Sequence, residues 1–226
     1  MSQIMHIRIL ALWIIIFTCL GLSAFQAQAG ELQVYVKDQE SKNVEDAILL
    51  IAPTDTTKSL RPKPPKEFVD QIDKEFVPHV KPVFVGSIVN FPNKDNIRHH
   101  VYSVSHTKTF ELPLYSGIKA SPVLFDTPGV VVLGCNIHDW MLAYIYVSDT
   151  PIFSQTQLDG IATVTDLPAG EYLLRLWHPG MGISESDNSR RVTIGESGTV
   201  KIEWQTTLKP VLKIPRTLTN QGVRYR

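Results

Sequence analysis

The stretch VVVLGCNIHDWMLAYIYV, Val130–Val147, decides the fold of this chain. Two runs rich in Val, Ile, Leu and Tyr flank a short polar loop, and such runs are typical of buried strands. The loop carries Cys135, His138 and Met141, which follow one another at intervals of three residues. We therefore expect two strands joined by a loop whose side chains can bind a metal ion.

A thiolate, an imidazole and a thioether together suit copper, which is soft as Cu(I) and accepts nitrogen well as Cu(II). Zinc is the weaker alternative, because methionine is a poor zinc ligand. A copper site of this kind needs a second histidine from another strand. The segment NFPNKDNIRHHVYSVS, residues 90–105, offers His99 and His100 just ahead of an alternating run. The competing interpretation is a β protein whose buried Cys135 and Met141 only pack.

Together these two segments resemble the cupredoxin, or blue-copper, family, and the short C-x2-H-x2-M loop is amicyanin-like. The resemblance covers about 66–149. It implies a Greek-key β-sandwich with one type 1 copper ion held by His99, Cys135, His138 and Met141. His99 is preferred to His100 because Val101 then fills the apolar place that follows in the family. The sequence departs from the family pattern at Val131, where an aromatic residue is common, and at His100, where an asparagine is usual.

The N-terminus predicts export. Arg8 precedes an apolar run that ends in small residues at Ala27 and Ala29, which is typical of a cleaved signal peptide at 1–29. An uncleaved membrane anchor is the rival interpretation. Cleavage leaves 21 Lys and Arg against 22 Asp and Glu, so no global charge favours nucleic acid. Cys135 is then the only cysteine, and ligation to a metal would protect its thiolate in the oxidising periplasm.

The rest of the chain also predicts an all-β protein. Proline-rich residues 53–65 read as a linker, because proline lacks the donor that a central strand needs. The runs in 31–52 and 151–205 resemble the two parts of a transthyretin-like, or carboxypeptidase-regulatory-like, β-sandwich. We therefore expect a second sandwich that is discontinuous, interrupted by the cupredoxin-like part. Residues 206–226 are basic and proline-containing, which favours a disordered tail.

The resemblances imply a function as well as a fold. Four protein ligands leave copper no open position for substrate, so we expect an electron carrier and not an enzyme. Its partners would be a donor dehydrogenase and an acceptor cytochrome-like protein. The segments HHVYS and GCNIHDWM also resemble exported methylamine utilization proteins. The alternatives are a copper carrier or assembly factor, or a partner-binding β module with structural or no copper. Trp140 is either a plug over the metal or a contact for a redox partner.

Overall fold

The computed structural model describes residues 29–55, 65–117, 120–181 and 189–210. These residues form strands, with one three-residue 3-10 helix, η2 (Pro179–Met181). The prediction of an all-β chain is confirmed. The expected signal peptide lies outside the described residues except for residue 29, as does most of the expected linker. No helix within the described ranges is long and apolar enough to cross a membrane.

A central β-sandwich holds the loop that carries Cys135, His138 and Met141. Its larger sheet has the order β6 (Val80–Phe84), β12 (Leu142–Ser148), β11 (Gly129–Gly134), β8 (His99–Ser105) and β9 (Lys108–Tyr115). Its smaller sheet has the order β10 (Val123–Phe125), β7 (Ser87–Asn90) and β3 (Lys66–Phe68). The hairpin of β4 (Asp70–Ile72) and β5 (Glu75–Val77) completes it. One apolar core fills this sandwich, and it includes Cys135 and Met141.

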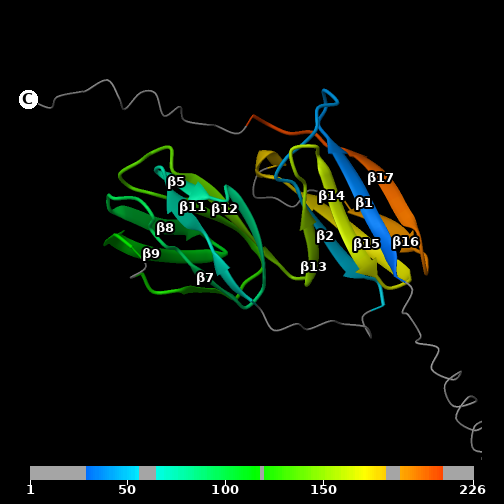
Figure 1. The fold of residues 1–226 in the computed structure, drawn as a ribbon, viewed down its shortest axis with the longest axis horizontal. Coiled ribbons are helices and arrows are strands. Elements are labelled where there is room, and N and C mark those ends of the chain that lie inside the picture. Colours follow the sequence, from blue (N-terminus) through cyan, green and yellow to red (C-terminus); the bar gives the residue numbers. More distant parts are fainter. Residues whose placement is uncertain (1–28, 56–64, 118–119, 182–188, 211–226) are drawn as a thin grey trace, which may run out of the picture.

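A flanking β-sandwich is built from the two ends of the described chain. One sheet has the order β14 (Ile161–Leu167), β1 (Gly30–Lys37) and β17 (Thr199–Gln205). The other has the order β13 (Ile152–Gln155), β2 (Ile48–Pro53), β15 (Gly170–Trp177) and β16 (Ser189–Ile194). Strand β1 pairs antiparallel with β14 and parallel with β17. Figure 1 shows the early strands, in blue, lying among the late strands, in yellow and orange.

Strand β2 explains how the two sandwiches meet. Its run ILLI is apolar at every position, and alternate side chains of a strand point to opposite faces. Leu49 and Ile51 enter the core of the flanking sandwich. Ile48 and Leu50 point the other way, into a separate apolar cluster that also contains Trp177 and residues of β6, β11 and β12. The sheet that holds β2 is therefore covered on both faces.

The segment after β17 remains bound to the flanking sandwich beyond the expected start of the tail. The backbone N–H of Thr206 donates to Lys37 O, and that of Lys209 donates to Gly180 O. These hydrogen bonds satisfy the backbone N–H groups of Thr206 and Lys209 on β1 and on η2. Residues 211–226 of the expected tail lie outside the described part.

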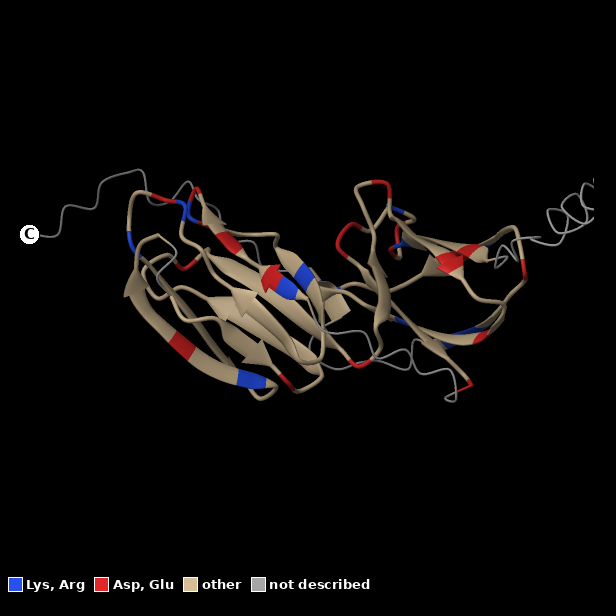
Figure 2. Ribbon diagram, turned by 60° about the horizontal axis from the view of Figure 1, so that its bottom comes forward, with Lys and Arg blue, Asp and Glu red and all other residues tan. Residues whose placement is uncertain are grey.

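Figure 2 shows acidic and basic residues interspersed over both sandwiches.

Candidate metal centre

The ligand loop is short and closed at both ends by the β11–β12 ladder. Gly134, the last residue of β11, pairs with Leu142, the first residue of β12. Only 135–141 lie between them. Inside the loop the backbone N–H of Met141 donates to His138 O at 2.9 Å. A loop this short gives its side chains little freedom to separate.

The second histidine comes from the start of β8, where two neighbouring residues have different partners. His99 lies with Cys135 and His138, and the three side chains form the one cluster of potential metal ligands found in the described ranges. His100 instead approaches Glu111, with its Nε2 2.8 Å from the carboxylate. Of the two histidines that the sequence offers, the structure therefore brings His99 to the loop.

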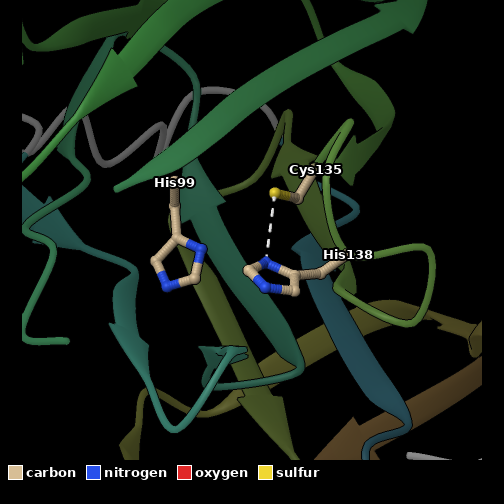
Figure 3. A group of neighbouring side chains, drawn as sticks. All are labelled: His99, Cys135 and His138. Carbon is tan, nitrogen blue, oxygen red and sulfur yellow. Dashed lines mark hydrogen bonds between the residues drawn. The ribbon is translucent and has the colours of Figure 1, made fainter. Parts of the chain in front are cut away.

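The donor atoms of this cluster are close enough to share one ion. One nitrogen of each imidazole and the thiol sulfur all lie within 4.8 Å of one another. Cys135 Sγ is 3.9 Å from His138 Nδ1, and Figure 3 shows both facing the His99 ring. A thiolate and an imidazole on one metal, at about 2.3 and 2.0 Å with trigonal angles, would lie about 3.7 Å apart. The separation of 3.9 Å between Cys135 Sγ and His138 Nδ1 fits that arrangement.

Burial differs among the four predicted ligands. His99 is fully buried, Cys135 is 5% exposed and Met141 is 1% exposed, whereas His138 is partly exposed. Met141 ends the loop and belongs to the same apolar core as Cys135. Three of the four predicted ligands are thus buried, and His138 is the one most exposed to solvent.

His99 carries the clearest sign of a ligand. Its Nε2 lies 2.6 Å from Asp95 Oδ2, so the ring donates there to a carboxylate. Its Nδ1 is buried and, within the described part of the chain, has no hydrogen-bond partner. Buried polar atoms are nearly always satisfied, so an unpartnered acceptor in a donor cluster is expected where a metal binds. The residues present therefore fit a metal ion.

Asp95 was missed by the sequence analysis. Burial raises the pKa of its carboxyl, but hydrogen bonds from the Lys74 backbone, from His99 and from the Asp73 backbone together outweigh burial and hold the pKa below its usual value. The carboxylate is therefore ionised and available to accept from His99. The signal in the sequence was its place four residues ahead of His99.

The surroundings of His138 favour its neutral form. Burial lowers the pKa of its imidazole, the nearby His99 and Lys74 lower it further, and Asp95 opposes them weakly. The neutral ring is the form that binds metals. Its ring centroid is 5.1 Å from that of Trp140, whose Nε1–H donates to Lys74 O at 3.1 Å. Trp140 thus packs on the loop and is anchored to the β4–β5 hairpin.

Gly134 packs closely against Tyr102 next to Cys135. A Cβ added to Gly134 would lie 2.9 Å from Cζ of Tyr102, which comes from the neighbouring strand β8. A side chain at this position would require the Tyr102 ring to move. The glycine therefore serves close packing beside the ligand loop.

Comparisons with known proteins place solved copper proteins among the structural matches. A copper-containing nitrite reductase from Thermus scotoductus SA-01 matches at 23% identity and TM-score 0.36, over 44% of this chain and only 27% of its own. A purple cupredoxin from Nitrosopumilus maritimus matches at 20% identity and TM-score 0.33, over 37% of this chain and 100% of its own. A reduced Cu(I) form of an amicyanin variant matches at 19% identity and TM-score 0.34, over 44% of this chain and 98% of its own. No protein-family model and no curated protein matches the chain.

Proposed function

We propose that this protein is an exported electron carrier that holds one type 1 copper ion through His99, Cys135, His138 and Met141. The observation that carries the proposal is the buried Nδ1 of His99, which has no partner in the described residues and lies within reach of a thiol and a second imidazole. Two imidazoles and one thiolate, with a weak thioether, form the donor set of blue-copper sites.

The composition of the site favours copper over zinc. Structural zinc sites use four strong ligands, and a catalytic zinc keeps a water in the fourth position. Here the residue that ends the loop is Met141, buried in the same core as Cys135. A thioether is a suitable weak axial ligand for copper and a poor ligand for zinc.

Burial of the site favours electron transfer over catalysis. When bound, copper supplies a reversible one-electron change. Full burial of His99 and near-complete burial of Cys135 exclude water and hold the ligand geometry fixed, so little rearranges between oxidation states. The partly exposed His138 gives the site an edge toward solvent, through which an electron can pass to a partner. The four protein ligands leave no position for a substrate, so we propose no enzymatic activity.

The same burial argues against the copper carrier or assembly factor. A carrier must release its ion, which requires open and exchangeable ligands. In this protein three of the four proposed ligands are buried, and the loop is closed by the pairing of Gly134 with Leu142. The module without copper, in turn, gives no role to the convergence of the His99 and His138 imidazoles with the Cys135 thiol.

The cellular setting follows from the sequence and is part of the proposal. Residues 1–29 would direct export to the periplasm and be removed. The mature chain would consist of a cupredoxin domain at 66–149 inserted into a transthyretin-like domain made of 31–52 and 151–205. Its partners would be a donor dehydrogenase and an acceptor cytochrome-like protein, with methylamine oxidation as the pathway that the resemblance suggests.

An anaerobic redox titration tests the proposed function. The copper-loaded mature protein should take up one electron per chain reversibly, and the reduced form should pass that electron to a cytochrome-type acceptor. Steady consumption of a substrate or of dioxygen, or failure to cycle between two stable states, would contradict the proposal.

A further inference from the structure

The histidine that supplies the buried ligand is held by a specific acid. His99 Nε2–H donates to Asp95 Oδ2 at 2.6 Å, and this bond leaves Nδ1 as the nitrogen with a lone pair. The other nitrogen of a histidine ligand normally donates to such a group, which fixes the tautomer and the ring orientation. Asp95 therefore determines which atom of His99 faces the cluster.

The same carboxylate also holds a turn of the β4–β5 hairpin. Asp95 Oδ1 accepts from the backbone N–H of Asp73 at 2.7 Å, and Oδ2 accepts from that of Lys74 at 2.9 Å. Asp73 and Lys74 both have positive φ, 52° and 60°, which is the conformation of a two-residue hairpin turn. Non-glycine residues adopt it at a cost, so external hydrogen bonds stabilise this turn.

The turn at Asp73 and Lys74 also contacts the ligand loop. Lys74 O accepts from Trp140 Nε1–H at 3.1 Å, and the Trp140 ring packs at 5.1 Å from the His138 ring. A continuous set of contacts therefore runs from His99 through Asp95, the 73–74 turn and Trp140 to His138. The two histidines lie 39 residues apart in the sequence, and this link connects them in addition to the direct contact of their rings, whose centroids are 4.9 Å apart.

We propose that Asp95 is a positioning residue that sets the tautomer of His99 and, through the 73–74 turn and Trp140, holds His138 in register with it. The inference rests on the proposed copper site for its consequence, while the contacts themselves exist in the chain without metal. It also assigns Trp140 the role of holding the loop in place, because its ring packs on His138 and its indole N–H donates to Lys74 O.

The first experiment uses the metal-free mature protein, so it does not depend on copper. Long-range nitrogen–proton NMR reports the tautomer of His99 in the wild type, in Asp95→Asn and in Asp95→Ala. We expect the Nε2–H tautomer with a slowly exchanging proton in the wild type, a mixed tautomer with rapid exchange in Asp95→Ala, and faster proton exchange in Asp95→Asn, because a neutral amide oxygen is a weaker acceptor than a carboxylate. The asparagine variant preserves volume, so it keeps the test valid if the alanine variant does not fold.

The control is Asp70→Asn. Asp70 lies in the same hairpin and pairs with Lys94 at 2.6 Å, but it does not contact a histidine. This substitution removes one carboxylate from the hairpin and should leave the His99 tautomer unchanged. An unchanged tautomer in Asp95→Ala would overturn the proposal, as would an unchanged proton exchange rate in Asp95→Asn or a wild-type His99 in the Nδ1–H form.

The second experiment uses the copper-loaded protein. Asp95→Asn should release copper about 10- to 100-fold more readily than the wild type, as is typical when a group that supports a metal ligand is lost. Its midpoint potential should rise, because a less basic imidazole stabilises Cu(II) less. Asp70→Asn should match the wild type in both readouts, and equal behaviour of the two variants would contradict a positioning role.

A double-mutant cycle tests the link to the loop. Trp140→Phe keeps an aromatic ring beside His138 but removes the donor to Lys74 O. If Asp95 acts through the turn, its substitution should accelerate copper release less in the Trp140→Phe background than in the wild type. Strictly additive effects would show that the two histidines are held independently. A wild type that binds no copper but passes the NMR test would refute the proposed function and leave the Asp95 assignment intact.

Discussion

Replacement of Trp177 by alanine tests the packing of the two sandwiches against each other. Trp177 is 1% exposed and lies in the apolar cluster that joins β2 and β15 to β6, β11 and β12. Its ring centroid is 5.2 Å from that of Tyr146 and 6.1 Å from that of Tyr144, both on β12. Loss of the ring would leave a cavity between two sheets that are already covered on their other faces.

The magnitude follows from that burial. A tryptophan side chain buries about 150–250 Å², and its truncation to alanine in a core costs about 3–5 kcal/mol. With a urea m-value of about 2 kcal/mol/M, a loss of about 4 kcal/mol moves the unfolding midpoint down by about 2 M. Trp177→Phe should lower the midpoint by less, because it retains a ring.

The assay is urea unfolding of the metal-free mature protein, followed by far-ultraviolet circular dichroism. Val104→Ala is the control, since Val104 is 80% exposed and its truncation should shift the midpoint little. A shift for Trp177→Ala as small as that of the control would refute the packing of the flanking sandwich on β12. The blue colour of the copper-loaded variant should persist under native conditions, because Trp177 belongs to a different apolar cluster from the one that contains Cys135 and Met141.

Three further predictions address the site and its surroundings. Cys135→Ser should abolish the intense visible absorption of the copper form, because the thiolate is its source; a spectrum that survives would place the metal elsewhere. Met141→Gln should keep copper bound but lower the midpoint potential, since a weak axial ligand tunes the site more than it holds the ion; a potential equal to that of the wild type would exclude Met141 as a ligand. Burial above all lowers the pKa of His178 to about 4, against a weaker opposing hydrogen bond to the Glu45 backbone and with help from His79. As pH drops, the His178 imidazole of the unfolded chain is protonated before that of the folded chain, so the free energy of unfolding should fall between about pH 6.5 and about pH 4. The full shift corresponds to about 3 kcal/mol, and the partial exposure of the ring makes the expected loss smaller than that. In urea unfolding of the metal-free protein, His178→Gln should reduce this loss, whereas the exposed His106→Gln should not; identical pH slopes in His178→Gln and the wild type would contradict the prediction.

The sequence carried much of the fold because its local patterns agree with its tertiary contacts. The runs on either side of the ligand loop are apolar because β11 and β12 face a core on one side and the flanking sandwich on the other. Cys135, His138 and Met141 stay on one short loop because β11 and β12 pair directly on either side of it. The run ILLI of β2 is likewise apolar at every position because both faces of its sheet are covered.

What the sequence could not provide were the contacts that depend on three-dimensional turns. Asp95 reads as one more polar residue in NKDNIRHH, and its role appears only when the β4–β5 turn folds over it. The partner of Trp140 is a backbone carbonyl 66 residues away, and no side-chain pattern marks a carbonyl. The contact of Ile48 and Leu50 with Trp177 likewise joins segments far apart in the sequence, and no local pattern specifies it.

The most direct test of the central claim is the absorption spectrum of the mature protein titrated with Cu(II), before and after ascorbate. We predict an intense band at about 600 nm that saturates at one copper per chain, bleaches on reduction and returns on reoxidation, as expected for a thiolate-bound type 1 site. Only weak absorption at saturation, or a band that does not return after reoxidation, would contradict the account of His99, Cys135, His138 and Met141 as a blue-copper site.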